Sequence, residues 1–300
     1  MPRRAAGSGK RARAAAYRII GRFGYLQLDT VSIAGARSHS IVLHSRLDGF
    51  DPTFAEELLL PGAPLFEYWG HEASWIPIEL YPTFAFRRHD FRHHPWWGDL
   101  MSEHPDVADY LRQRIRDEGP LRSLDMEGSG SQGWWDLKVS KKVATAMWSS
   151  GELAIRERRN FQRSYDLPER VIPEGWRRER VSRERAIETL ALRALPGHGW
   201  ATTGTITQTF RLVQKDVIAA LDRLVESNEI VPCVLHEGSR RVRGWVRPID
   251  LELAVRLENV RPRRDRGVLL SPFDPVLWDR NRVPQLFGFH QMLEIFKPAE

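Results

Sequence analysis

The sequence has a single cysteine, Cys233, among 300 residues. One thiol allows no internal disulfide and cannot by itself build a cysteine-rich zinc site, so a reducing compartment is the natural setting. No apolar run approaches the roughly 20 residues that a membrane-spanning helix needs. The basic N-terminus also lacks the apolar core of a secretion signal. We therefore expect a cytoplasmic protein that has no membrane partner.

Metal-binding motifs are incomplete. The stretch HEAS at residues 71–74 begins like a zinc-protease motif, but Trp75 stands where the second histidine is required. His89, His93 and His94 lie close together, yet no carboxylate or cysteine cluster completes a site around them. A solvated or phosphate-facing basic helix is the better interpretation, and we expect no metal.

Motifs for nucleotide binding and covalent catalysis are missing as well. GSGK at residues 7–10 has no preceding strand and no Ser or Thr after its lysine, and GSGSQG at residues 128–133 has no lysine at all. We find no nucleophile elbow and no lysine that a motif would place for imine chemistry. We therefore expect no cofactor.

The composition is that of an ordinary folded protein with a basic surface. Hydrophobic residues make up 42% of the chain and charged residues 28%, and the length suffices for two or three compact units. The formal charge is +6 and the isoelectric point is about 9.7. Positive potential attracts phosphates, so a polyanionic partner is favoured, although many basic proteins bind no nucleic acid.

The first hundred residues predict several short elements. Residues 11–23 have helical periodicity, and YLQLDTVS at residues 25–32 has an extended pattern. Residues 51–60 begin with Asp and Pro, a good arrangement for a helix start. Residues 78–94 have a mixed aromatic and basic helical pattern, which Pro82 is expected to kink.

A pattern of helices followed by a basic strand pair occurs twice after residue 105. The first copy has a helix over residues 106–118, stopped by Gly119 and Pro120, then a second helix that includes Leu137, and two strands around a turn at Arg159 and Asn160. The second copy has helical patterns at residues 183–195, 205–212 and 215–228, then strands at residues 230–238 and 240–248.

This order, helices followed by a basic hairpin, is typical of a winged helix, a helix-turn-helix variant that places one helix in a DNA groove. Winged helices also serve as protein-protein modules. We predict an α+β protein of tandem winged-helix domains, with a C-terminal β-rich segment that is truncated. The predicted segments are a basic flexible arm (1–16), a first winged-helix-like unit (17–100), a second (101–175), a third (176–250) and the start of the C-terminal segment (251–300).

Gln27 and Asp29 form the most suggestive polar pair. In a strand, successive side chains alternate faces, so both groups would point one way while Leu26 and Leu28 point into a core. In a helix the two polar groups would diverge by roughly 200°. A carboxylate beside an amide can orient one water and can stabilise positive charge on a sugar whose glycosidic bond is breaking. From the spacing alone, an exposed strand edge without chemistry is the stronger alternative.

Three long blocks resemble a known family. They are RFGYLQLDTVSIAGARSHSIVLHSR, LFEYWGHEASWIPIEL and LLSPFDPVLWDRNRVPQLFGFHQMLEIFKPAE, at residues 22–46, 65–80 and 269–300. These blocks resemble the crosslink-repair DNA glycosylases of the YcaQ/AlkZ type, which are built from tandem winged helices. The family's catalytic motif is Gln, an apolar residue, then Asp or Gln. Here it stands as Gln27, Leu28 and Asp29, which is similar to the aspartate branch associated with general repair rather than with self-resistance.

The resemblance implies a monomeric enzyme that acts on double-stranded DNA with N7-alkylated purines, including interstrand crosslinks. An N7-alkylguanine already carries positive charge and leaves as a neutral base, so no general acid is needed. Asp29 would stabilise the deoxyribosyl cation and activate water, and Gln27 would position that water. Without an imine lysine, the enzyme would be a monofunctional glycosylase that leaves an abasic site.

Other residues are candidates for the cleft or for DNA contacts. His71 and Glu72 would line the active-site cleft, or else hydrogen-bond to each other or to the backbone as scaffold. The SPFDPVLWDR segment at residues 271–280 is expected to be structural, because its aromatic residues offer apolar area and its aspartates cap turns. The candidate phosphate contacts, which a solvated basic surface would also explain, are Arg37, His39, His44, Arg46, Lys138, Lys141, Lys142, Arg156, Arg158 and Arg159.

Two departures from the family pattern and one rival remain. The usual leading helix is shortened, and the chain stops where family members continue into a β-rich segment. The rival is a non-catalytic winged-helix DNA-binding protein such as a transcription regulator. It predicts sequence-specific affinity without base release, whereas the enzyme predicts lesion dependence.

Overall fold

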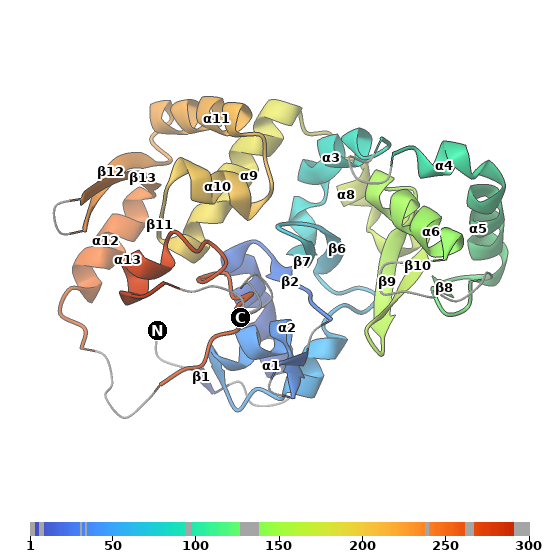
Figure 1. The fold of residues 1–300 in the computed structure, drawn as a ribbon, viewed down its shortest axis with the longest axis horizontal. Helices are drawn as coiled ribbons and strands as arrows, with labels where there is room; N and C mark the ends of the chain where they lie inside the picture. Colours follow the sequence, from blue (N-terminus) through green and yellow to red (C-terminus); the bar gives the residue numbers. More distant parts are fainter. Residues whose placement is uncertain are drawn as a thin grey trace, which may run out of the picture. The chain divides into compact units, whose positions relative to one another are not determined.

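The computed structural model describes residues 4–5, 9–30, 32–33, 35–93, 98–126, 138–237, 240–261 and 267–290. These residues form an α+β fold of short helices and small sheets, most of them antiparallel, as predicted (Figure 1). Within this described part, no helix combines the length and the apolar character needed to cross a membrane. The predicted GSGSQG loop, Leu137 and His94 lie outside the described residues.

The chain divides into two compact units. Unit 1 contains residues 1–55, 70–74 and 187–300, and unit 2 contains residues 56–69 and 75–186. Each unit therefore draws on more than one of the five segments expected from the sequence, and that five-part division stays a prediction.

Unit 2 contains the first predicted helix pair and wing. Helix α5 (Pro105–Glu118) begins with its proline and ends at Gly119, whose φ of 93° few other residues adopt. Helix α6 spans Val139–Ser150, and strands β9 (Ala154–Arg159) and β10 (Gln162–Asp166) form the hairpin. With β8 (Leu121–Arg122) they make a sheet in the order β8-β10-β9. This copy of the pattern is confirmed, with the turn at residues 160–161.

The segment before this wing differs from the prediction. The single helix over residues 78–94 is replaced by two three-ten turns, η2 (Ile78–Leu80) and η3 (Pro82–Phe84), and by helix α3 (Ala85–Asp90). Pro82 begins η3 instead of kinking a helix. Proline is favoured in the first turn of a helix, because backbone N–H groups there have no acceptor within the helix and proline lacks that N–H. The other short elements before the wing are η1 (Pro52–Glu57), β6 (Leu65–Trp69), β7 (Ala73–Pro77) and α4 (Leu100–Glu103), and two short helices follow it, α7 (Pro168–Val171) and α8 (Glu174–Arg178).

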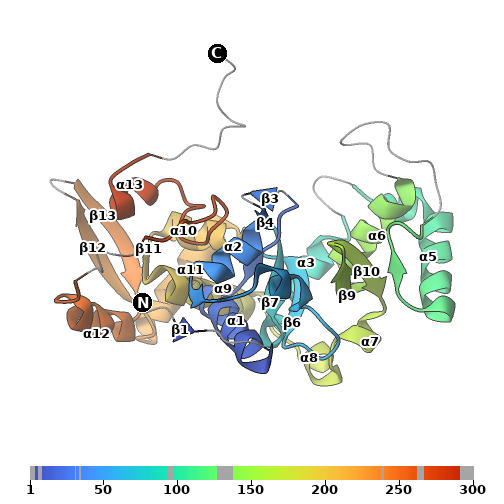
Figure 2. The same ribbon diagram turned by 90° about the horizontal axis from the view of Figure 1, so that it is seen from below.

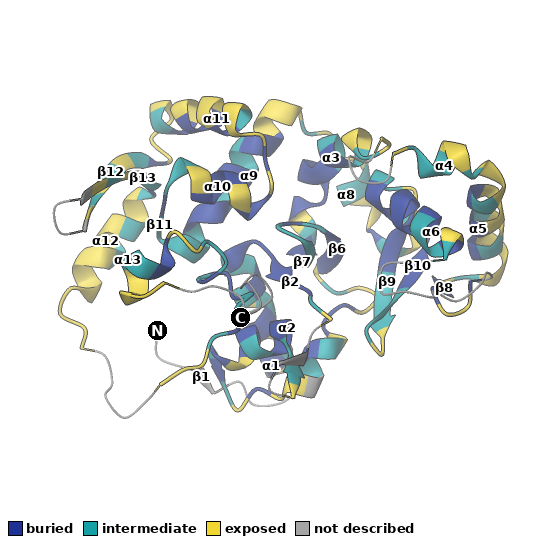
Figure 3. Cartoon of the chain, in the orientation of Figure 1, coloured by how far each residue is buried: buried dark blue, intermediate teal, exposed yellow. Residues whose placement is uncertain are grey.

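Unit 1 begins with helix α1 (Gly9–Phe23). The helix starts two residues before the predicted start, so residues 9–16, which the sequence assigned to a flexible arm, are helical. Its buried face contains Ala12, Ala16, Ile20 and Phe23, at helical spacing, and this burial explains why the basic segment is ordered (Figure 3). The elements that follow are β2 (Leu26–Gln27), β4 (Ala36–Arg37), α2 (Ser38–His44) and β5 (Leu47–Asp48); β3 (Ser32–Ile33) pairs with β4, and β1 (Arg4–Ala5) pairs with β5.

The second predicted winged helix is also confirmed, and it belongs mainly to unit 1. Helices α9 (Arg183–His198), α10 (Thr203–Thr209) and α11 (Gln214–Glu226) precede strands β12 (Val231–Glu237) and β13 (Arg240–Val246). A short strand that the sequence did not reveal, β11 (Trp200–Ala201), completes a sheet in the order β11-β13-β12. Helices α12 (Pro248–Leu257) and α13 (Val283–Phe287) follow.

Candidate functional site

Gln27 is the last residue of β2, and Asp29 lies two residues beyond it. The Leu28 N–H donates to the Ala73 carbonyl at 2.8 Å, so hydrogen bonding continues past the strand end. The predicted alternation is only partly seen. Leu26 and Leu28 are buried, as expected, but Gln27 is also only 7% exposed, and Asp29 alone is half-exposed. Gln27 is therefore buried, and Asp29 lies at the edge of the core.

A glycine sets the position of this strand. Helix α1 ends at Phe23, and the Gly24 N–H donates to the Ile20 carbonyl at 2.9 Å with a φ of 80°. A Cβ at Gly24 would meet the Phe210 ring at 2.9 Å, so glycine is required both for the turn and for the close approach. The next residue, Tyr25, is 1% exposed and meets the edge of the same Phe210 ring at 5.7 Å. The strand that contains Gln27 is thus packed against α10.

His71 and Glu72 lie in the loop between β6 and β7 and are both anchored to the second winged helix. The His71 Nδ1 lies 2.8 Å from the Gln208 carbonyl, which can only accept, so Nδ1 carries the hydrogen and Nε2 is left as an acceptor. The imidazole stacks on Trp278 at 4.5 Å, and burial lowers its pKa below the usual 6.5, so His71 is neutral at pH 7. Glu72 is paired with Arg211 at 2.6 Å. The two residues do not bond to each other: His71 bonds to a backbone carbonyl of α10, as the scaffold alternative allows, and Glu72 bonds to the Arg211 side chain after α10.

The segment at residues 271–280 is hydrogen-bonded to α2 and to the turn that follows it. Arg46 donates to both carboxylate oxygens of Asp274, at 2.7 and 2.8 Å, and the Asp274 side chain is fully buried. One oxygen of Asp274 also accepts the Val276 N–H at 2.9 Å, which caps a turn as predicted. Ser38 and Ser271 share a hydrogen bond of 2.5 Å. The guanidinium of Arg46 therefore has a structural role.

The other candidate contacts near α2 differ in exposure. His39 has no exposed surface, so it cannot reach a phosphate in this structure. Arg37 is half-buried in β4. His44 is exposed, and its Nδ1 lies 3.0 Å from the Phe50 carbonyl. His44 is therefore the better placed of the two histidines for a DNA contact.

The candidate contacts of unit 2 also separate into inward and outward groups. Arg158 has a side chain that is only 7% exposed, and it pairs with Glu67, whereas Arg159 beside it is 67% exposed. Arg156 pairs with the buried Asp166 at 3.1 Å. The half-buried lysines are Lys138, Lys141 and Lys142, of which Lys138 donates to the Met126 carbonyl at 3.1 Å.

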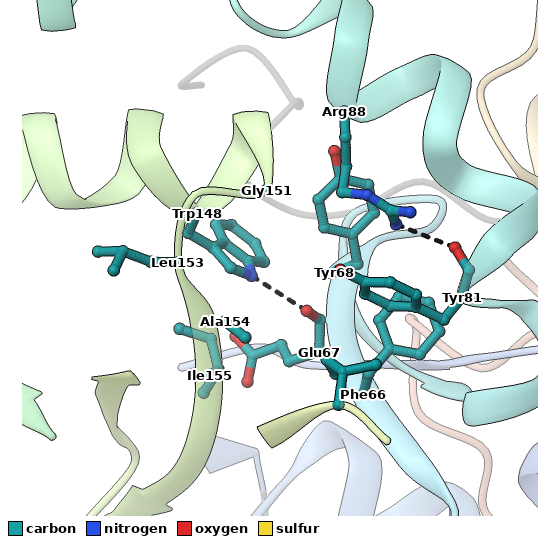
Figure 4. Close-up of a pocket in the computed structure, with 11 residues that line it drawn as sticks. Phe66, Glu67, Tyr68, Tyr81, Arg88, Trp148, Gly151, Leu153, Ala154 and Ile155 are labelled. Atoms are coloured by element: carbon teal, nitrogen blue, oxygen red, sulfur yellow. Dashed lines mark hydrogen bonds between the residues drawn. The ribbon is translucent and has the colours of Figure 1, made fainter. Parts of the chain in front are cut away.

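Glu67 is a buried carboxylate that the sequence analysis did not identify. It accepts two bonds from Arg158, both at 2.7 Å, and one from Arg163 at 2.6 Å. Burial raises its pKa, but the charges and hydrogen bonds of the two arginines outweigh burial and lower the pKa from 4.5 to about 2. Figure 4 shows its neighbour Trp148, whose indole N–H donates to the Glu67 carbonyl at 3.0 Å. The sequence signal for this buried ion pair was a single glutamate inside the apolar strand LFEYW, because a buried charge requires partners of opposite charge.

Metal binding has no support in these residues. Across the described ranges, no group of three or more His, Cys, Asp and Glu side chains is arranged to hold a metal ion.

Comparison with known proteins identifies the family. The structure is similar to that of the Streptomyces sahachiroi DNA glycosylase AlkZ, with a TM-score of 0.54 and 16% sequence identity, over 88% of this chain and 71% of the other. At that identity the likeness concerns the fold, and it agrees with the winged-helix arrangement. The model of the family described as DNA glycosylase AlkZ-like matches residues 20–300. Since this match covers nearly the whole sequence, the chain belongs to the AlkZ-like DNA glycosylase family.

Proposed function

We propose that the protein is a monofunctional DNA glycosylase that hydrolyses the N-glycosidic bond of N7-alkylated purines and unhooks interstrand crosslinks. The observation that supports this proposal is the position of Gln27 at the end of β2 and of the partly exposed Asp29 two residues later, inside the family match. Under this proposal the chain belongs to the aspartate branch, and its partner is alkylated double-stranded DNA.

The chemistry needs few groups. Alkylation at N7 makes the purine cationic, so the base departs neutral without a general acid. The carboxylate of Asp29 stabilises positive charge as it develops on the sugar and accepts a proton from the attacking water. The amide of Gln27 orients that water through a second hydrogen bond. Water adds to the sugar carbon, the base leaves with the bonding electrons, and an abasic site remains.

The test uses an oligonucleotide duplex that contains one N7-methylguanine. We expect the wild-type chain to produce alkali-labile abasic sites, and Asp29→Asn to slow their formation by at least about a hundredfold, since positioned proton transfer contributes about 10²–10⁴-fold. Gln27→Leu is expected to lower the rate by a smaller factor. Asp222→Asn, on the exposed face of α11, removes the same charge elsewhere in unit 1 and serves as the matched control.

Equal base release by Asp29→Asn and the wild-type chain would remove Asp29 from the mechanism. A protein that binds one DNA sequence selectively and releases no base would instead be a winged-helix regulator.

A further inference from the structure

Helix α1 presents a row of positive charges to solvent in unit 1. The helix contains five cations and no aspartate or glutamate. Its apolar side is buried, and its opposite side is exposed. Figure 2 shows that α1 lies on the opposite side of α2 from strands β3 and β4, so this strand pair does not cover it. The α1 row consists of the exposed Lys10, Arg11 and Arg18, with the half-buried Arg22 at its edge.

The cations of the α1 row are not neutralised within the described part of the chain. None of the four side chains has a hydrogen-bond or ion-pair partner there. The fifth cation of the helix, Arg13, lies over the Phe54 ring at 4.7 Å. On helix α5, by contrast, Arg112 pairs with Glu152 at 2.7 Å. A solvated face usually mixes charges of both signs, as α5 does, so the α1 row differs from an ordinary solvated face.

The row is unfavourable for the helix by itself and leaves its backbone open. Arg18 and Arg22 are four residues apart, and like charges at this spacing destabilise a helix. Two small residues, Ala14 and Gly21, stand between the charges, and a Cβ at Gly21 would meet nothing within 4 Å. Small residues allow another backbone to approach closely. A polyanion on this face would remove the repulsion.

The length of the row suits one strand of DNA. A helix rises by about 1.5 Å per residue, so Lys10 and Arg22 are about 18 Å apart along the axis. One strand of B-DNA has a phosphate about every 3.4 Å of duplex axis, which gives about five phosphates over that length. The row therefore complements the charge of a phosphodiester backbone, which it would contact without reading sequence.

An anionic membrane is the other large polyanion that basic helices bind. Such helices place their apolar face among the lipid headgroups. In α1 that face is already packed against the protein, since Ala16 and Ile20 have no exposed surface. A nucleic acid requires only the charged face. DNA therefore fits the exposed side of α1 better than a membrane does.

Helix α11, which a winged helix would place in a groove, is less suited to phosphates. It contains three carboxylates and two cations, Lys215 and Arg223, so its net charge is −1. Arg223 is also paired with Glu188. Since positive potential attracts phosphates, α1 is the more favourable of these two helices of unit 1 for a DNA backbone.

We propose that the exposed side of α1 binds the phosphodiester backbone of duplex DNA through the α1 row. The choice of DNA rests on the proposed function. Helix α1 leads through Gly24 into β2, which ends at Gln27. The backbone contact is therefore made by the element that directly precedes the candidate catalytic residues.

The test measures the affinity of the full chain for an undamaged duplex by fluorescence anisotropy at several salt concentrations. Ala14→Glu places a carboxylate four residues after Lys10 and four before Arg18, on the exposed side. Opposite charges at this spacing stabilise a helix, so a loss of binding would not reflect a weaker helix. We expect weaker binding and a slope of log affinity against log salt that is smaller by about 2, because two cations are neutralised. Ala14→Gln adds the same bulk without the charge and should bind like the wild-type chain.

A second variant removes the cations themselves. Arg11→Gln combined with Arg18→Gln should also reduce the salt slope by about 2, since each phosphate contact contributes about 0.9. The matched control, Arg112→Gln combined with Arg122→Gln, removes two arginines that pair with carboxylates. Its slope should equal that of the wild-type chain. Thermal melting followed by circular dichroism checks that each variant is folded.

Wild-type affinity and slope in Ala14→Glu, or in the double variant of Arg11 and Arg18, would overturn the proposal. An equal loss in the control of Arg112 and Arg122 would do so too, because net charge alone would then explain the effect. Vesicles of phosphatidylcholine and phosphatidylserine provide the remaining comparison. If the wild-type chain binds them and Ala14→Glu does not, while duplex affinity is unchanged, the α1 row belongs to a membrane contact and the proposal fails.

The outcome is separable from that of the proposed function, because binding of an undamaged duplex requires no chemistry. Base release that depends on Asp29, with unchanged duplex affinity in Ala14→Glu, would remove the α1 contact and leave the glycosylase. Weaker duplex binding in Ala14→Glu, without base release by the wild-type chain from any alkylated duplex, would do the reverse.

Discussion

Replacing Glu67 by Gln removes the negative charge that lies between the guanidinium groups of Arg158 and Arg163. The side chains of these residues are 0%, 7% and 18% exposed, so water cannot screen the two remaining positive charges effectively. A pKa of about 2 in place of 4.5 corresponds to about 3 kcal/mol of stabilisation. Removing one partner of a buried ion pair costs about 3–5 kcal/mol. We therefore expect Glu67→Gln to lower the free energy of unfolding of unit 2 by about 3–5 kcal/mol.

Urea denaturation followed by tryptophan fluorescence measures this loss. Trp148 is a local reporter, because the Arg163 guanidinium lies 4.1 Å from its ring centre. A slope of about 1–3 kcal/mol per molar urea predicts a midpoint lower by about 1–5 M. The matched control, Glu157→Gln, breaks the exposed pair with Arg159 in the same hairpin and should cost less than about 1 kcal/mol.

The pH dependence gives an independent check on Glu67. Because its folded-state pKa is lower than 4.5, its contribution is complete above pH 4.5 and is lost as the pH falls towards 2. In Glu67→Gln, the free energy of unfolding should therefore fall less between pH 4.5 and pH 2 than in the wild-type chain. Equal midpoints for Glu67→Gln and Glu157→Gln, or an unchanged acid profile, would refute the reasoning.

Three further predictions follow from the same contacts. Arg159→Gln should weaken DNA binding and reduce the slope of log affinity against log salt by about 1. Arg158→Gln should mainly destabilise the fold. Fluorescence anisotropy of labelled DNA at several salt concentrations distinguishes the two variants. Asp274→Asn should lower stability by about 3–5 kcal/mol in thermal or urea unfolding, because it leaves Arg46 without its buried partner charge. Burial, and then the charge of Arg282, lower the pKa of His198 to about 3 in the folded chain, so on acidification the unfolded chain binds the proton first. The free energy of unfolding should therefore fall by about 1–2 kcal/mol between pH 6.5 and pH 5. Denaturation at several pH values should show that His198→Gln removes this pH dependence.

Local sequence patterns predicted the two winged helices well. Helix α5 has a proline at its start and Gly119 at its end, and the two basic hairpins show alternation on either side of a turn. Such signals act within a few residues of each other, so one chain is enough to read them. The strand β11 was missed because two residues, Trp200 and Ala201, contain no periodicity. Its presence depends on β13, where Gly244 leaves space for the Trp200 ring that a Cβ would meet at 2.5 Å.

The candidate site was predictable only in part, because burial depends on residues distant in the sequence. The alternation rule predicted an extended segment for Gln27 and Asp29, but it could not show that Gln27 is buried while Asp29 is partly exposed.

The charge of the chain illustrates why arginine content alone identifies DNA contacts poorly. Arg46 and Arg158 were candidates on sequence grounds, yet each pairs with a fully buried carboxylate, that of Asp274 or Glu67. A buried carboxylate without a cationic partner would cost a large free energy of desolvation. The arginines that remain outward, such as Arg159, lie in the hairpins, where a winged helix contacts the DNA backbone. Backbone contacts fix position without reading sequence. Under the proposed function, lesion selectivity then has to come from groups that meet the base and sugar, and the proposal assigns that role in unit 1 to Gln27 and to the carboxylate of Asp29, whose charge suits a cationic purine.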